Sequence, residues 1–240
     1  MKIIKAKDYE EMSKLAGAFI MSQVISKPDS VLGFATGTTP IGTYEKLGQW
    51  NKEGIVDFSN VKTVNLDEYC GITKDHPQSY RYFMEHNLFS KINIKAKNTF
   101  LPNGETKDCD AECQRYEKVL NNLGGVDLQL LGIGNNGHIG FNEPSNVFTK
   151  LTNKVKLTQS TIEANSRLFN KKEEVPLYAI TMGIQTIMRA KKILLIATGK
   201  SKAEILNKTL NGPIDPKVPA SILQLHPDVT VIADEEALNC

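Results

Sequence analysis

Short apolar segments recur along this chain and alternate with longer segments of mixed polarity. Five such runs, rich in β-branched residues, lie at 31–35, 61–66, 126–133, 193–197 and 229–233. Runs of this kind are typical of strands that are buried on both faces, and the segments between them are long enough for helices. The alternation therefore predicts an α/β fold, in which a mostly parallel sheet lies between two layers of helices as a three-layer sandwich.

The connecting segments carry helix signals. Pro40 suits the first turn of a helix that follows Thr39, and residues 110–123 have apolar side chains at helical spacing before a pair of glycines. The apolar run at 15–21 is too short to span a membrane, so it predicts one face of a helix. At 240 residues the chain can build one large core, and we predict a single domain over 1–240.

Composition excludes several classes of protein. The chain has 29 basic and 27 acidic residues, a net charge of +2, and no concentrated basic patch, so no nucleic-acid partner is expected. Four cysteines (Cys70, Cys109, Cys113 and Cys240) lack the paired spacing of a zinc site. Because nothing resembles a secretory signal or a membrane span, we expect reduced thiols in a cytoplasmic protein.

The loop after the first of these runs is a candidate phosphate site. Ligands of open α/β sheets bind beyond the carboxyl ends of the strands. Gly37, Thr38 and Thr39 lie there, just before a helix whose free N–H groups and dipole favour an anion. The alternative is a simple β–α turn in which Thr39 caps the helix.

A nucleoside triphosphate does not fit this loop. Gly37 and Gly42 have the glycine spacing of a P-loop, but Thr43 and Tyr44 replace its lysine and its Ser/Thr. A second loop, at 199–202, supplies lysines at another predicted strand-to-helix junction and strengthens the phosphate interpretation. The alternative is that these lysines are solvated surface charges.

The segment 132–137 matches the G-x-G-x-x-G pattern of dinucleotide-binding proteins and follows a predicted strand. The required context is missing, since Gly140 and Pro144 interrupt the helix that should follow. Residues 150–161 also contain no acidic residue for a ribose. A dinucleotide cofactor is therefore not expected.

The same loop gathers polar side chains: Asn136, His138, Asn142 and Glu143. Histidine is the side chain best suited to move a proton near neutral pH, and a nearby carboxylate orients it and stabilises its cation. A histidine held by structural hydrogen bonds is the alternative, but its polar neighbours favour a catalytic role.

Four motifs spread along the chain resemble the glucosamine-6-phosphate deaminase family. They are LDEY at 66–69, HPQSY at 76–80, GHIGFNEP at 137–144 and LQLH at 223–226. The resemblance covers nearly the whole chain. It implies a modified Rossmann-like fold and the conversion of glucosamine 6-phosphate and water into fructose 6-phosphate and ammonia, with no metal or nucleotide cofactor.

The resemblance also implies roles for individual residues. Asp67 matches the base that removes the C2 proton, although by itself it also suits a helix cap or a surface acid. His138 matches the acid–base group of ring opening, with Asn136 and Glu143 orienting it. Some relatives carry aspartate at the position of Asn136, and an amide there adds no charge to stabilise a protonated His138.

Two further cations match the phosphate contacts of the family, namely Arg167 and Lys202. They would complement the backbone donors around Gly37, Thr38 and Thr39, because arginine grips an oxyanion with two prongs and lysine supplies a point charge. Each cation is otherwise an ordinary surface charge.

Regulation and partners are less defined. Longer relatives have an allosteric site for an acetylated amino-sugar phosphate, but the segment 151–156 matches its basic pattern poorly. We therefore expect little or no activation by that ligand, and a homo-oligomer remains allowed. The competing functions are a 6-phosphogluconolactonase and a non-catalytic sugar-phosphate sensor.

Overall fold

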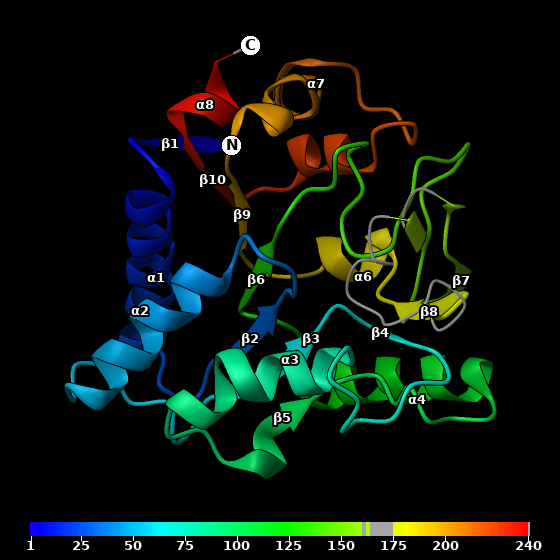
Figure 1. Cartoon of the computed structure of the whole chain (residues 1–240), viewed down its shortest axis with the longest axis horizontal. Helices are drawn as coiled ribbons and strands as arrows, with labels where there is room; N and C mark the ends of the chain where they lie inside the picture. The colour runs from blue at the N-terminus through cyan, green and yellow to red at the C-terminus, as the bar shows by residue number, and fades with distance from the viewer. Residues whose placement is uncertain (160–161, 164–174, 240) are drawn as a thin grey trace.

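A sheet of parallel strands runs through the centre of the molecule (Figure 1). The computed structural model describes residues 1–159, 162–163 and 175–239. Within that part of the chain, the sheet has seven strands in the order β1-β10-β9-β6-β2-β3-β5. Their bounds are Lys2–Ala6 (β1), Val31–Phe34 (β2), Lys62–Asn65 (β3), Thr99–Phe100 (β5), Leu128–Leu131 (β6), Ile193–Ala197 (β9) and Val229–Asp234 (β10).

The predicted strands are confirmed. The run 193–197 coincides with β9, and the other four predicted runs overlap β2, β3, β6 and β10. The strand pairings described in this sheet are all parallel. The sequence did not reveal β1, whose burial pattern is mostly exposed because it lies at the edge of the sheet.

Helices cover both faces of this sheet, which confirms the three-layer α/β sandwich. Alternate residues of β9 face opposite layers: Leu194 and Ile196 join a core with α1 and α2, whereas Leu195 joins a core with α4, α6 and α7. The α-helices in the described part of the chain are α1 (Tyr9–Ser26), α2 (Ile41–Lys52), α3 (Tyr80–Asn87), α4 (Cys109–Asn122), α6 (Ile184–Met188), α7 (Ala203–Asn211) and α8 (Glu235–Leu238). Short 3-10 helices span Phe89–Lys91 (η1), Ala96–Asn98 (η2), Lys200–Lys202 (η4) and Pro219–Leu225 (η5).

Helix α1 illustrates how sequence determines these elements. Asp8 is its N-cap, and the Asp8 side chain accepts a hydrogen bond from the Glu11 amide at 2.9 Å. Its buried residues include Met12, Ala16 and Ile20, which are spaced four apart and so lie on one face. In the described part of the chain, no helix is long and apolar enough to cross a membrane.

Helix α2 starts differently from the expectation that Thr39 caps it. The N-cap is Pro40, and no side chain makes a cap hydrogen bond from that position. Instead the Gly42 amide donates to the Tyr9 hydroxyl oxygen at 2.9 Å, so α1 supplies the cap. The alternative in which Thr39 caps the helix is therefore wrong, because Tyr9, a residue distant in sequence, makes the hydrogen bond.

A second, antiparallel sheet lies beside the first and consists of β4 (Asp67–Tyr69), β8 (Tyr178–Thr181) and β7 (Asn153–Lys156). The position of residues 67–69 just after the predicted strand at 61–66 indicates a loop, but these residues form a strand, so that prediction is wrong. Asp67 pairs with Thr181 across β4 and β8, so the strand depends on a partner more than a hundred positions away, which local sequence does not reveal.

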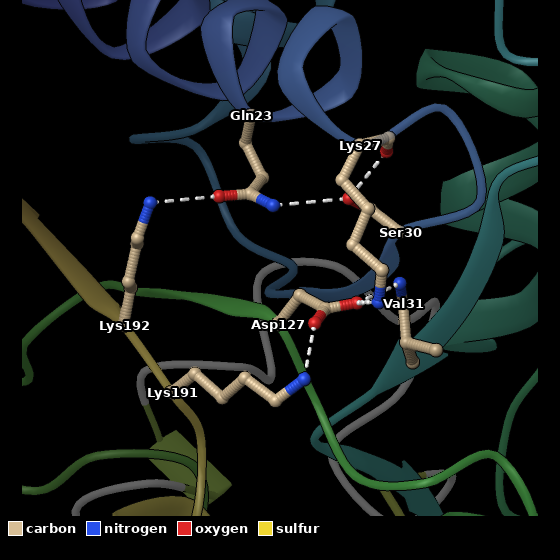
Figure 2. A network of polar contacts seen from close by, with 7 residues as sticks. All are labelled: Gln23, Lys27, Ser30, Val31, Asp127, Lys191 and Lys192. Carbon is tan, nitrogen blue, oxygen red and sulfur yellow. Dashed lines mark hydrogen bonds and ion pairs between the residues drawn. The ribbon is translucent and has the colours of Figure 1, made fainter.

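A polar network joins the starts of three neighbouring strands on the side of the sheet where β2, β6 and β9 begin (Figure 2). Asp127 accepts hydrogen bonds from Lys27 Nζ at 2.6 Å, the Val31 amide at 2.8 Å and Lys191 Nζ at 2.8 Å. Burial acts to raise the pKa of Asp127, but the hydrogen bonds from Lys191, Lys27 and Val31 together hold it below its ordinary value.

The carboxyl ends of the strands lie on the opposite side of the sheet, and a topological switch point lies there between β2 and β6. From β2 the strand order continues to β3 and β5, whereas from β6 it continues to β9 and β10. Because the strands are parallel, the loops after β2, β6 and β9 leave from the same edge. Ligands of such sheets bind where these loops diverge.

Candidate functional site

Asp67 begins β4, and only Leu66 separates it from the end of β3, so the second sheet holds its carboxylate beside the carboxyl end of the first. The residue is only 6% exposed. Burial, and then the charge of the adjacent Glu68, raise the pKa of Asp67 to about 8. A buried carboxyl whose pKa lies this close to neutral pH is suited to general-base chemistry.

The loop that carries His138 packs against this carboxylate. Gly140 has a φ of +57°, and a Cβ there would lie 3.4 Å from Asp67 Oδ2 and 2.9 Å from Thr181 Oγ1. The Phe141 amide donates to Thr181 Oγ1 at 3.1 Å. The loop after β6 therefore rests on the β4–β8 pair, and glycine at 140 permits both the turn and the close approach.

His138 lies over the backbone of Gly134. A Cβ at position 134 would be 2.2 Å from His138 Cε1, so the imidazole occupies the space that any other residue would need. The Nδ1 atom of His138 is buried and has no hydrogen-bond partner among the described residues. It lies 3.5 Å from Glu143 Oε1, which is close enough for an ion pair but long for a hydrogen bond.

Asn136 connects His138 and Glu143 without adding charge. Its Nδ2 donates to Glu143 Oε2 at 2.6 Å, and its Oδ1 accepts from the backbone amide of His138 at 3.2 Å. Thr158 Oγ1 donates to Glu143 Oε1 at 3.4 Å. Asn136 thus holds the Glu143 carboxylate beside the imidazole.

Asn142 holds the same loop in place through side-chain hydrogen bonds. It is buried, and its Nδ2 donates to the Ile139 carbonyl at 2.9 Å and to the Met182 carbonyl at 2.8 Å, while its Oδ1 accepts from Thr149 Oγ1. These contacts tie the loop to the segment that follows β8. Asn142 therefore has structural partners, unlike the Nδ1 of His138.

The predicted phosphate-binding residues follow β2 and β9, the two strands that flank β6. Gly37 has a φ of +98°, and the exposed Gly37 and Thr38 turn the chain from β2 towards α2. Lys202 ends η4 after β9, and its Nζ donates to Asn135 Oδ1 at 2.5 Å, in the loop that leads to His138. Burial lowers the pKa of Lys202. Arg167 lies outside the described residues.

Sequence reasoning missed the role of Glu68. Its buried carboxylate accepts hydrogen bonds from the amides of Tyr69 at 2.9 Å, Tyr80 at 3.0 Å and Arg81 at 3.0 Å. Burial raises the pKa of Glu68 to about 7, although these hydrogen bonds oppose the shift. Glu68 thus fixes β4 to the start of α3. Its only signal in the sequence was its place next to Asp67.

A cavity of about 340 Å³ is lined by Glu68, Arg81 and Arg115, among others. Adjacent residues of a strand point to opposite faces, so this cavity and Asp67 lie on different sides of β4. Its guanidinium groups are already paired, Arg81 with Glu85 and Arg115 with Glu112. We therefore place the candidate site at the Asp67 and His138 side.

Within the described ranges, no group of three or more His, Cys, Asp or Glu side chains could hold a metal ion. The site instead offers a buried carboxylate, an imidazole with its own carboxylate partner, and a lysine beside glycine turns. This set suits proton transfer on an anionic substrate.

Comparison with protein families gives a match over residues 9–232 to the glucosamine-6-phosphate isomerases/6-phosphogluconolactonase family. The chain belongs to this family. A relative from Lachnoclostridium phytofermentans, named glucosamine-6-phosphate deaminase, is 58% identical over 97% of this chain and 98% of its own length. Another of that name, from Thermoanaerobacter pseudethanolicus, is 55% identical over 100% of this chain and 94% of its own length.

Solved structures of the family agree with the fold. A structure described as a monomeric glucosamine-6-phosphate deaminase has a TM-score of 0.96 and 48% identity, covering 99% of this chain and 98% of its own. The 6-phosphogluconolactonase from Leishmania guyanensis has a TM-score of 0.76 and 20% identity, covering 99% of this chain and 97% of its own. That second likeness shows the shared fold alone.

Proposed function

We propose that this chain is a glucosamine-6-phosphate deaminase, which converts glucosamine 6-phosphate and water into fructose 6-phosphate and ammonia. Relatives of that name share more than half of their residues with it over nearly its whole length. The observation that carries the proposal is the close approach of the His138 loop to Asp67, since a Cβ at Gly140 would lie 3.4 Å from Asp67 Oδ2.

Asp67 is the base of the isomerisation step. It removes the proton from C2 of the open-chain amino sugar and returns a proton to C1 through an enolamine. Burial supports this role because a carboxylate whose pKa is about 8 is a stronger base than an ordinary one. Glu68 holds the strand from its other face.

His138 moves the proton that ring opening requires, from the C1 hydroxyl to the ring oxygen. Glu143 lies 3.5 Å from Nδ1 and stabilises the imidazolium that forms during the transfer. Asn136 is a positioning residue, because it holds the Glu143 carboxylate by a hydrogen bond of 2.6 Å.

The phosphate of the substrate is bound by Gly37, Thr38 and Thr39 together with Lys202 and Arg167. Lys202 supports this assignment, since it is partly buried at the edge where β2, β6 and β9 end. Burial lowers its pKa, and a phosphate beside the ammonium would reverse that effect.

The deciding experiment adds glucosamine 6-phosphate to the purified chain and measures ammonia and fructose 6-phosphate. We expect both products in equal amounts. Hydrolysis of 6-phosphogluconolactone without ammonia release would instead assign the second activity of the family. Binding of the amino sugar with no turnover by either route would indicate a sensor.

Regulation follows from the same proposal. We expect a hyperbolic dependence of rate on substrate that N-acetylglucosamine 6-phosphate leaves unchanged. The segment 151–156 supports this expectation because its Lys154 makes a cation–π contact, with Nζ 4.3 Å from the centroid of the Tyr178 ring. A sigmoidal curve that the acetylated sugar makes hyperbolic would overturn it.

A further inference from the structure

Three cysteines lie together where β4 ends and α4 begins. Cys70 follows β4 directly, Cys109 opens α4, and Cys113 lies one helical turn later on α4. Cys70 and Cys109 are partly exposed, whereas Cys113 is buried. All three are free thiols.

Cys70 and Cys109 are the pair in contact. Their sulfur atoms are 3.3 Å apart, although the residues are 39 positions apart in the chain. A disulfide requires a sulfur–sulfur distance of about 2.05 Å, so a closure of roughly 1.3 Å completes the bond. Both residues stand at the ends of their elements, where small side-chain rotations are accommodated most easily.

We propose that Cys70 and Cys109 form an oxidative modification site, at which a hydroperoxide converts the two thiols into an intramolecular disulfide. The inference is independent of the deaminase assignment. It follows from the contact between two thiols that belong to separate elements and that solvent reaches.

The chemistry balances with a hydroperoxide as the oxidant. The Cys109 sulfur attacks the peroxide, the O–O bond breaks, and a sulfenic acid and one water (or alcohol) form. The Cys70 sulfur then attacks the sulfenic sulfur, the S–O bond breaks, and a second water leaves with the Cys70 proton. Each sulfur loses one electron, and the peroxide gains two.

The surroundings of Cys70 indicate which sulfur attacks first. Burial, and then its contact with Cys109, raise the pKa of the Cys70 thiol to about 12. A thiol that is mostly protonated attacks a peroxide slowly, so we assign Cys70 to the second step, where the sulfenic sulfur of Cys109 is already held beside it.

The disulfide would tie the end of β4 to the start of α4. It would close a loop that spans the whole of α3 and β5. Closing a loop of this length restricts the unfolded chain, so oxidation should raise the midpoint of thermal unfolding by about 5–10 °C. A reductant should reverse the shift.

The test treats the purified chain with hydrogen peroxide, counts free thiols and maps peptides by mass spectrometry. We expect a pair of thiols to disappear and the peptide 63–74 to become linked to the peptide 108–115, with dithiothreitol reversing both changes. Trypsin leaves Cys109 and Cys113 in one peptide, so the Cys113→Ser variant assigns the link.

Matched variants make the proposal falsifiable. The link and the thermal shift should persist in Cys113→Ser and Cys240→Ser and disappear in Cys70→Ser and Cys109→Ser. Far-UV circular dichroism checks that each variant folds. The proposal is overturned if the wild-type thiols stay free, if they are oxidised only to sulfinic acid, or if the link survives in Cys109→Ser.

Discussion

The imidazole of His138 lies directly over Gly134, four positions earlier in the same loop. A Cβ at 134 would meet three atoms of the imidazole within 2.4 Å, whereas a Cβ at Gly132 would meet nothing within 4 Å. The two glycines of this loop therefore differ in function, although both belong to the same sequence pattern. Gly134 leaves space for the imidazole, whereas a side chain at Gly132 would extend into open space.

Replacing Gly134 with alanine should displace the imidazole and lower kcat by about 100-fold or more, since a general acid–base group contributes on that scale. Stability should fall little, because His138 is not part of the core. The Gly132→Ala variant is the control and should keep nearly wild-type turnover. Equal rates in the two variants would contradict the placement of His138.

Replacing Asp67 with asparagine should nearly abolish turnover, by roughly 1,000-fold, while substrate binding stays measurable by calorimetry.

The Asp67→Asn change should also stabilise the fold at alkaline pH. The folded-state pKa of Asp67, about 8, lies above the ordinary value of 3.8, so the wild-type chain loses stability as the pH rises between those values.

Urea denaturation at about pH 5 and about pH 8 would measure this effect. The stability gap between Asp67→Asn and wild type should widen by up to about 1.4 kcal/mol for each pH unit. An unchanged gap would show that Asp67 does not titrate in this window.

Replacing Glu68 with glutamine should move the acid limb of kcat/KM to lower pH by up to about one unit. The negative charge of Glu68 raises the pKa of Asp67, so its removal lets the base form of Asp67 appear earlier. Glu105→Gln, an exposed change at the same cavity, is the control. An acid limb that does not move in Glu68→Gln would exclude this coupling.

Replacing Asp127 with asparagine should destabilise the fold by about 2–3 kcal/mol near neutral pH, because two lysines and the Val31 amide lose their charged partner. Since the pKa of Asp127 is lowered in the folded state, its contribution is present above the ordinary pKa and is lost as the pH falls below about 4. The exposed Asp29→Asn is the control. The difference in urea midpoint between the variant and wild type should shrink at acid pH.

The central sheet could be predicted because its strands are continuous apolar runs, of which 193–197 is the clearest. The second sheet could not, since β4 carries two carboxylates in three residues and forms only by pairing with β8. Similarly, Tyr9 caps α2 and Glu68 holds α3 through contacts that local patterns do not encode.

The candidate site shows the same division. The convergence of loops after β2, β6 and β9 follows from the parallel order of the strands and could be expected. The roles of Asp67, His138 and Lys202 came from the family resemblance. The use of Asn136 as a holder of Glu143 required side-chain geometry.

The two sheets divide the proposed substrate between them. The loops of the parallel sheet are assigned to the phosphate, whereas Asp67 belongs to the antiparallel sheet. The distance between the bound phosphate and the base is therefore set by how the two sheets pack together. That distance determines which length of sugar phosphate fits. A sugar phosphate one carbon shorter would be anchored with its reacting carbon out of register with Asp67, so the chain would select its substrates by length as well as by charge.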